Sequence, residues 1–229
     1  LKRGDTFILK VSGAIISPQN VEYISKYSEM LKRLYGMGYR FTVVVGGGPV
    51  SRNYISAGRS LGLNESLLDM LGIEVSRLNA SLLIGKLYDI AYPTPPKSMS
   101  ELLSAWSSGK VVVMGGLQPG QSTNAVAALA AEILNAKVLV NASRVDAVYD
   151  KDPTKYANAR RLKRITIKSL KRILRRSFEE AGTYQLMDLL SLNILERSRI
   201  PLVVIDGRRP ELIEEFIVKG KVVGTYVKP

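Results

Sequence analysis

The sequence predicts an α/β protein built on a mostly parallel sheet with helices on both faces. Short β-branched runs alternate with amphipathic helical patterns along the chain, and three of these runs end in glycine. Strands that alternate with helices favour a parallel sheet. No linker or low-complexity stretch interrupts the 229 residues, and 46% of them are hydrophobic, which is enough for a sizeable core. We therefore expect one domain over 1–229, with a soft division into two lobes, 1–136 and 137–229.

The first third of the chain is predicted from glycine boundaries and helix start signals. Proline at a first helical position and a polar capping side chain before it mark where helices begin, and glycine marks where they end. The expected elements are a strand over 5–11, a helix from Ser17 and Pro18 to about 35 that ends at Gly36 or Gly38, a strand over 40–45, a helix from Pro49 to about 61, and a helix from Glu65 to about 84 that is capped by Asn64.

The middle of the chain holds the stretch that carries most of the functional argument. A run of prolines over 93–96 cannot continue a strand and indicates a surface turn. The expected elements are a short strand over 88–91, a helix from Ser98 or Ser100 to about Gly109, a buried strand over 111–114, a glycine-rich loop over 115–121, and an alanine-rich helix from Thr123 to about 135 with Ser122 and Thr123 as capping candidates.

The last third repeats the alternation with a more basic composition. The expected elements are a strand over 137–141, a loop over 142–153, a polar loop over 154–164, a helix over 167–175, a helix over 185–198 after a break at Gly182, a strand over 201–205, a helix over 210–219, and a strand over 222–227.

The strand, glycine loop and helix start around 111–123 together suit an anion. Glycine lets the backbone approach a phosphate, and the unpaired N–H groups of the first helical turn point at it. A plain strand-to-helix turn is the alternative. We favour phosphate because the arrangement recurs after 7–11 at Gly13 and after 42–45 at Gly46. Ligands of open α/β sheets bind outside the carboxyl ends of the strands.

The loop over 115–122 is not a standard P-loop. It almost fits the pattern G-x-x-x-x-G-K-[ST], but Gln121 stands where the lysine belongs. That lysine supplies charge to the terminal phosphates. The hydrogen-bonding side chains Gln118, Gln121, Ser122 and Thr123 still suit a phosphate or a base edge.

Two cations flank the other glycine loops, Lys10 before Gly13 and Arg52 after the triple glycine. Lys10 ends an otherwise apolar strand, so it is either an edge residue or a charge aimed into a site, and Gly13 just after it favours the site. Arg52 lies one turn into the helix after the triple glycine. Its planar guanidinium group could clamp a phosphate, or it could be one more surface cation.

Acidic residues supply the remaining candidates. Asp146 could orient a lysine beside the transferring phosphate, and Tyr149 and Asp152 could frame a nucleoside. The alternative is a capped loop, which Asp-Pro pairs often form. Asp69 could accept hydrogen bonds from ribose hydroxyls or could pair locally.

Composition excludes several kinds of chemistry. The chain has no cysteine and no histidine, so disulfides, thiolate sites, Ser-His triads and most zinc sites are ruled out. Any reaction must use carboxylates, lysine, arginine, hydroxyls, backbone amides and Mg²⁺ carried by phosphates. No 18-residue apolar run or signal peptide occurs, so we expect a soluble cytoplasmic protein without a membrane segment.

The formal net charge of +13 favours anionic partners, and much of the excess falls in 160–176. The simplest interpretation of this stretch is a solvated helix face, because Leu170, Ile173 and Leu174 keep helical spacing. Aromatic residues are sparse there, so the stacking platform for single-stranded nucleic acid is missing. Nucleic acid is therefore not the expected partner.

Motifs along the whole chain resemble those of archaeal-type uridylate (UMP) kinases in the amino-acid-kinase family. The most specific is the glycine loop ending in Gln-Pro-Gly-Gln-Ser-Thr. The motifs are Lys10-Val-Ser-Gly13, Val45-Gly-Gly-Gly48 with Arg52, Leu68-Asp-Met-Leu-Gly-Ile73 with Arg77-Leu-Asn-Ala80, Gly115 to Thr123, Val145 to Pro153, and Ala181-Gly-Thr-Tyr184 with Met187-Asp188.

The resemblance implies a three-layer αβα sandwich, a homohexamer, and conversion of ATP and UMP to ADP and UDP with Mg²⁺. It implies that the catalytic residues are Lys10 and Asp146, with Asp146 organising Lys10, and that no protein side chain binds the metal. The lobe over 1–136 would hold UMP and the lobe over 137–229 would hold ATP. The implied ATP-binding residues are Lys10, Ser12, Gly13, Gly48, Arg52, Ser143, Tyr149 and Asp152. The implied UMP-binding residues are Gly47, Asp69, Leu117, Gln118, Pro119, Gly120, Gln121, Ser122 and Thr123.

The sequence departs from the family pattern at four positions. Ala14 stands where lysine or serine is usual, which removes one phosphate contact. Arg144 and Ala147 replace the usual asparagine and glycine, and Leu189 replaces a proline. These changes concern the adenosine side of the implied site.

Other enzymes of similar fold need residues at positions where this sequence can be checked. An acetylglutamate kinase would carry a lysine in the late Gly-Gly region, and an isopentenyl phosphate kinase would use a histidine; both are missing. A carbamate kinase-like enzyme stays open, as does a non-catalytic nucleotide sensor or nucleic-acid-binding module suggested by the positive charge.

Overall fold

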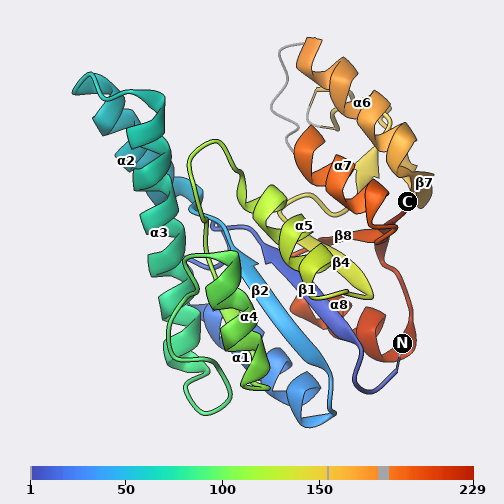
Figure 1. Cartoon of the computed structure of the whole chain (residues 1–229). Coiled ribbons are helices and arrows are strands. Elements are labelled where there is room, and N and C mark those ends of the chain that lie inside the picture. The colour runs from blue at the N-terminus through green and yellow to red at the C-terminus, as the bar shows by residue number, and fades with distance from the viewer. Residues whose placement is uncertain (1, 154, 180–185) are drawn as a thin grey trace.

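The computed structural model describes residues 2–153, 155–179 and 186–229. Its main element is a seven-stranded sheet in the order β3-β2-β1-β4-β8-β9-β7, with helices packed on both faces (Figure 1). Neighbouring strands are parallel except β8 and β9. The prediction of a mostly parallel sheet between two helical layers is confirmed.

The first predicted lobe supplies one side of this sheet. Its strands are β1 (Thr6–Val11), β2 (Arg40–Val45) and β3 (Val112–Met114), and its helices are α1 (Val21–Gly36), α2 (Gly48–Ser60), α3 (Glu65–Lys86), α4 (Met99–Ser107) and α5 (Thr123–Ile133). The predicted caps are observed: the side chains of Asn64, Ser98 and Ser122 accept backbone N–H bonds at the starts of α3, α4 and α5.

Two local predictions in this half are wrong. The helix expected from Ser17 begins only at Val21, because Asn20 Nδ2 donates to Ala14 O at 2.9 Å and holds the preceding residues in a turn. The strand expected over 88–91 is a turn in which the amides of Ile90 and Ala91 both donate to one helix-end carbonyl. Only Ala91 forms an isolated bridge to the sheet.

The second predicted lobe supplies the other side. Its elements are β4 (Val138–Ser143), β5 (Val148–Tyr149), β6 (Arg161–Leu162), β7 (Arg164–Thr166), α6 (Ile167–Glu179), α7 (Leu189–Arg197), β8 (Leu202–Asp206), α8 (Pro210–Lys219) and β9 (Gly224–Lys228). One continuous sheet thus spans both lobes, and the division between them falls between β1 and β4.

The polar segment expected as a loop over 154–164 is partly a sheet edge. β6 pairs with β5 in a separate two-stranded sheet, and β7 pairs with β9 at the edge of the main sheet. Thr225 Oγ1 donates to Leu162 O and Tyr226 N donates to Lys163 O at 3.0 Å, which fastens the segment to β9. The helix expected from 185 begins at Leu189, after Asp188 caps it. Residue 185 and the motif over 181–184 lie outside the described residues.

Alternate residues of β1 point to opposite faces of the sheet, as strand geometry requires. Phe7 and Leu9 join the core beneath α1, α3 and α8, whereas Ile8 joins the core beneath α4, α5, α6 and α7. Lys10 follows Ile8 on the second face, at the carboxyl end of the strand. This register places a lysine beside the starts of α5 and α7.

Candidate active site

The loops after β1 and β2 touch each other backbone to backbone. The amide of Gly46 donates to Val11 O at 3.0 Å. A Cβ atom on Gly13 would lie 2.0 Å from Gly46 O, and one on Gly48 would lie 2.1 Å from Gly13 O. Gly48 also has a positive φ of 66°. Glycine is therefore required here by space as well as by backbone conformation.

The third glycine loop follows β3 and is fastened to α3. The amide of Gly116 donates to Ser76 Oγ at 2.7 Å. Arg77 donates from Nε to Gly116 O and from Nη2 to Leu117 O, at 3.1 and 3.2 Å. Ser76 and Arg77 thus fix the start of the loop, while Gln118 at its tip is exposed.

The same helix also holds the second glycine loop. Asn79, which is buried, donates from Nδ2 to Gly46 O at 3.0 Å and to Gly47 O at 3.2 Å. Sequence reasoning gave no role to Asn79 or Ser76. The signal that could have found them is a pair of polar residues on the buried side of an otherwise apolar helix, because buried polar side chains need partners.

A hollow of about 150 Å³ lies between α2, α3 and the third loop. Its lining includes Gly47, Asp69, Gln121 and Thr123, four of the residues expected to bind UMP. Asp69 Oδ2 accepts the amide of Gly120 at 2.8 Å, which ties the loop tip to α3. A cavity of this size holds one six-membered ring. The structure therefore gathers these residues around a space that suits a single ring.

Lys10 lies half-buried beside these loops. Burial lowers the pKa of Lys10 from 10.5 to about 8, and the negative charge of Asp188 opposes this shift. Asp188 accepts from Ser122 Oγ at 2.5 Å and from the Ser191 amide at 2.8 Å, so it caps α7 and contacts the N-cap of α5. Lys10, Ser122 and Asp188 thus form one group built from three elements.

Asp146 has other partners. It accepts a hydrogen bond from Tyr149 Oη at 3.0 Å, and its Oδ2 lies 3.4 Å from Nη2 of Arg161. Burial first, and then Asp146, raise the pKa of Tyr149. The carboxylate that acts electrostatically on Lys10 is Asp188, which sequence reasoning recorded only as part of a motif. A catalytic role for Asp146 stays a prediction.

Of the other residues expected on the ATP side, Ser143 ends β4, Tyr149 ends β5, and Asp152 lies in the loop after β5. Ser143 Oγ bonds with both the amide and the carbonyl of Val145, at 3.1 and 3.0 Å, and its carbonyl accepts the Gly207 amide. Asp152 is buried, and its carbonyl accepts the amides of Lys155 and Tyr156. The Ser12 amide donates to Ala142 O, which joins this region to the loop of Lys10.

Comparison with known proteins places this geometry in a family. Residues 5–206 match the amino acid kinase family. The chain belongs to that family. A uridylate kinase of Hyperthermus butylicus is 46% identical over 220 residues, covering 96% of both chains. A uridylate kinase of Sulfolobus acidocaldarius is 46% identical over 222 residues, covering 96% of this chain and 98% of the relative.

Two solved structures are similar to this chain over nearly its full length. The uridylate kinase of Archaeoglobus fulgidus has a TM-score of 0.87 and 37% identity, covering 96% of this chain and 99% of that one. A UMP kinase of Bacillus anthracis has a TM-score of 0.82 at 20% identity, over 99% of this chain and 97% of that one, and supports the fold alone.

The departures from the family pattern are accommodated locally in this amino acid kinase. The Ala14 amide donates to Ser12 Oγ at 3.2 Å, so the turn closes without a longer side chain. Ala147 is fully buried. Leu189 is the first residue of α7, and Asp188 supplies the start signal that a proline there would reinforce. Arg52 lies exposed one turn into α2, and Arg144 is exposed after β4.

Proposed function

We propose that this member of the amino acid kinase family transfers the terminal phosphoryl group of ATP to UMP, giving ADP and UDP. The observation that carries the proposal is the convergence of Lys10 and the three glycine loops at one edge of the sheet, beside a hollow of about 150 Å³. The identity of 46% with uridylate kinases over 96% of the chain supports the same substrate pair.

We assign the acceptor and donor to the two sides of Lys10. The acceptor would lie against the third loop and α3, where a hollow sized for a single ring favours a pyrimidine over a purine. The proposed acceptor contacts are Gly47, Asp69, Leu117, Gln118, Pro119, Gly120, Gln121, Ser122 and Thr123. The proposed ATP contacts are Lys10, Ser12, Gly13, Gly48, Arg52, Ser143, Tyr149 and Asp152.

The proposed reaction needs no strong base. An oxygen of the acceptor phosphate is already a nucleophile, so catalysis consists of aligning two anions and stabilising charge on the moving phosphoryl group. Backbone amides of the glycine loops orient the phosphates, and the Lys10 ammonium group neutralises charge between them. Asp188 keeps Lys10 protonated and positioned, which makes it a positioning residue.

Magnesium would enter with ATP. The glycine loops offer backbone amides and Lys10 is itself a cation, so the site suits phosphate oxygens rather than a bare metal ion. Within the described parts of the chain, no group of three or more acidic residues is placed to hold a metal. Mg²⁺ bound through phosphate oxygens would supply further charge neutralisation. The homohexamer and the cytoplasmic location stay predictions. No helix within the described ranges is long and apolar enough to cross a bilayer.

A coupled assay of ADP release tests the substrate assignment. With ATP and Mg²⁺ present, we expect kcat/KM for UMP to exceed that for AMP by about 100-fold or more, because a hollow of about 150 Å³ accommodates one ring more readily than two. CMP and carbamate are tested as further acceptor substrates in the same assay. Equal turnover of all monophosphates, or turnover of carbamate alone, would contradict the proposal.

The role of Asp188 is tested by Asp188→Asn. Asparagine also caps helices, so α7 should remain intact. Loss of the negative charge lowers the pKa of Lys10 further below about 8. We expect the alkaline limb of kcat/KM for ATP to move to lower pH by about one unit.

Glu132→Gln is the matched control, because it removes a carboxylate of α5 that pairs with Arg197 and has no place in the proposed site. The alkaline limb should stay in place in this variant. An unmoved limb in Asp188→Asn, or an equal shift in both variants, would show that Asp188 does not control Lys10.

A further inference from the structure

A second strongly charged region lies on the outer edge of the sheet, away from the glycine loops. Residues 155–175 contain nine lysines and arginines and no acidic residue. They include a loop, β6, the edge strand β7 and most of α6 (Figure 1). We call the exposed cations of this edge and of the adjoining amino ends of β4 and β8 the basic face: Lys137, Arg164, Lys168, Arg172, Arg175 and Arg199.

Cations of the basic face have no acidic partner within the described residues. Nearby cations outside it do: Lys171 pairs with Glu196 and Arg197 pairs with Glu132. Lys168 and Arg172 are four residues apart on α6, a rise of about 6 Å, which is less than the Debye length in physiological salt. Like charges at this spacing destabilise a helix. A bound polyanion would remove that repulsion.

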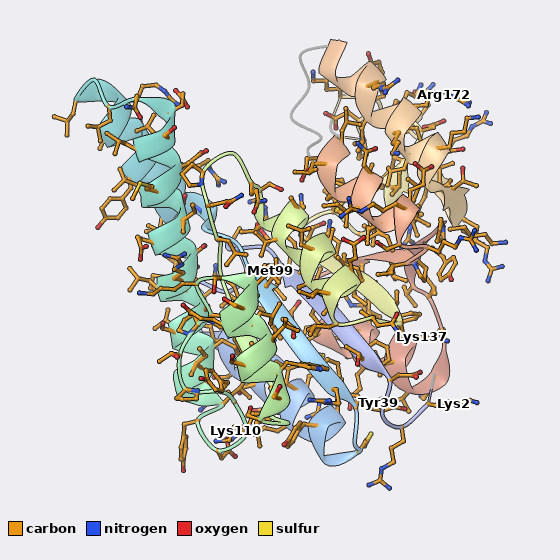
Figure 2. The ribbon with its side chains drawn as sticks, in the orientation of Figure 1. Lys2, Tyr39, Met99, Lys110, Lys137 and Arg172 are labelled. Atoms are coloured by element: carbon orange, nitrogen blue, oxygen red, sulfur yellow. The ribbon has the colours of Figure 1, made fainter. Side chains whose placement is uncertain are left out.

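The apolar side of α6 packs against the core of the protein. Ile167, Leu170 and Leu174 are buried in the core beneath α5 and α7. The apolar side is therefore unable to enter a bilayer, which membrane-binding amphipathic helices require. The opposite side presents its cations outward, as Arg172 shows (Figure 2).

A hollow of about 570 Å³ continues the basic face at the amino ends of β1, β4 and β8. Lys137, Arg199 and Tyr226 line it, together with Asp5. The guanidinium of Arg164 lies 5.5 Å from the ring centre of Tyr226, so the hollow adjoins β7, from which α6 continues. This end of the sheet is opposite to the carboxyl ends that carry the glycine loops.

We propose that the basic face binds the phosphate backbone of a nucleic-acid duplex without reading its sequence. A row of unpaired cations leading into a hollow suits a continuous line of phosphates, and neutralising phosphates is the main source of such affinity. A duplex fits better than a single strand because Tyr226, the one aromatic side chain among the residues that line the hollow, already contacts Arg164. This binding is independent of the proposed kinase reaction.

Fluorescence anisotropy with a labelled DNA duplex, and with an RNA duplex of the same sequence, tests the proposal. The intact protein should bind at about 50 mM salt and lose most of its affinity by about 200 mM. The double variant Lys168→Glu/Arg172→Glu should bind at least tenfold more weakly at low salt, with a salt slope smaller by about two.

The control is Lys86→Glu/Lys110→Glu, which changes net charge equally at exposed lysines at the end of α3 and between α4 and β3 (Figure 2 labels Lys110). It should leave binding unchanged, and kinase turnover should be unchanged in both double variants. Absence of binding at low salt, an equal loss in the control, or tighter binding to phosphatidylserine vesicles than to either duplex would overturn the proposal.

Discussion

Replacing Lys10 with methionine should slow phosphoryl transfer severely and leave the fold at least as stable. Removing a charged group that acts on the transition state typically lowers kcat about 100- to 1,000-fold. The stability expectation comes from the pKa of Lys10, which burial lowers from 10.5 to about 8. Holding this ammonium in the folded state therefore costs up to about 3 kcal/mol at neutral pH. Methionine fills similar space without a charge.

The pH dependence of stability should show that the charge of Lys10 destabilises the fold. Because the folded-state pKa of Lys10 is below the unfolded value of 10.5, the unfolded chain binds more protons between pH 8 and 10.5. The stability of the intact protein should therefore rise through that window, and the advantage of Lys10→Met should be largest below pH 8. Urea unfolding at several pH values measures both.

Lys26→Met is the matched control, because Lys26 is an exposed lysine paired with Glu22 on α1. Its turnover should equal that of the intact protein. Lys10→Met with near-normal turnover would remove Lys10 from the reaction. A variant that loses both turnover and several degrees of melting temperature would show a structural role instead.

Local signals predicted much of the fold. The cap residues Asn64 and Ser122 act through their own side chains within one turn, so sequence alone found them. The errors occurred where distant or competing contacts decide the outcome. Asn20 bonds back to Ala14 and delays the first helix. Leu162 pairs with Val148 of β5, and Thr225, far along the chain, donates from Oγ1 to its carbonyl.

The same distinction between local signals and distant contacts explains which residues of the candidate site the sequence predicts. Glycine loops are visible in sequence because their backbone geometry excludes other residues. The partnership of Lys10 and Asp188 joins β1 to α7 and depends on where the sheet places them, so spacing alone did not reveal it. Asn79 was missed for the same reason, since its role comes from carbonyls of Gly46 and Gly47 on another element.

Gly48→Ala should remove activity through the backbone alone. The new Cβ would lie 2.1 Å from Gly13 O and 2.2 Å from Gly13 C, both main-chain atoms, so the loops after β1 and β2 must separate. The positive φ of 66° adds about 1–2 kcal/mol of strain. A displacement of about 1 Å at reacting groups lowers rates about 100-fold, so we expect at least that loss in kcat/KM for ATP.

Gly85→Ala separates this local effect from the general effect of replacing glycine. Gly85 lies in α3, and a Cβ there would meet no atom within 4 Å. Alanine should stabilise this helix by up to about 1 kcal/mol and leave turnover unchanged. If Gly48→Ala kept normal turnover, the contact between the first two glycine loops would have no part in holding phosphate, and the proposed arrangement of ATP around Lys10 would fail with it.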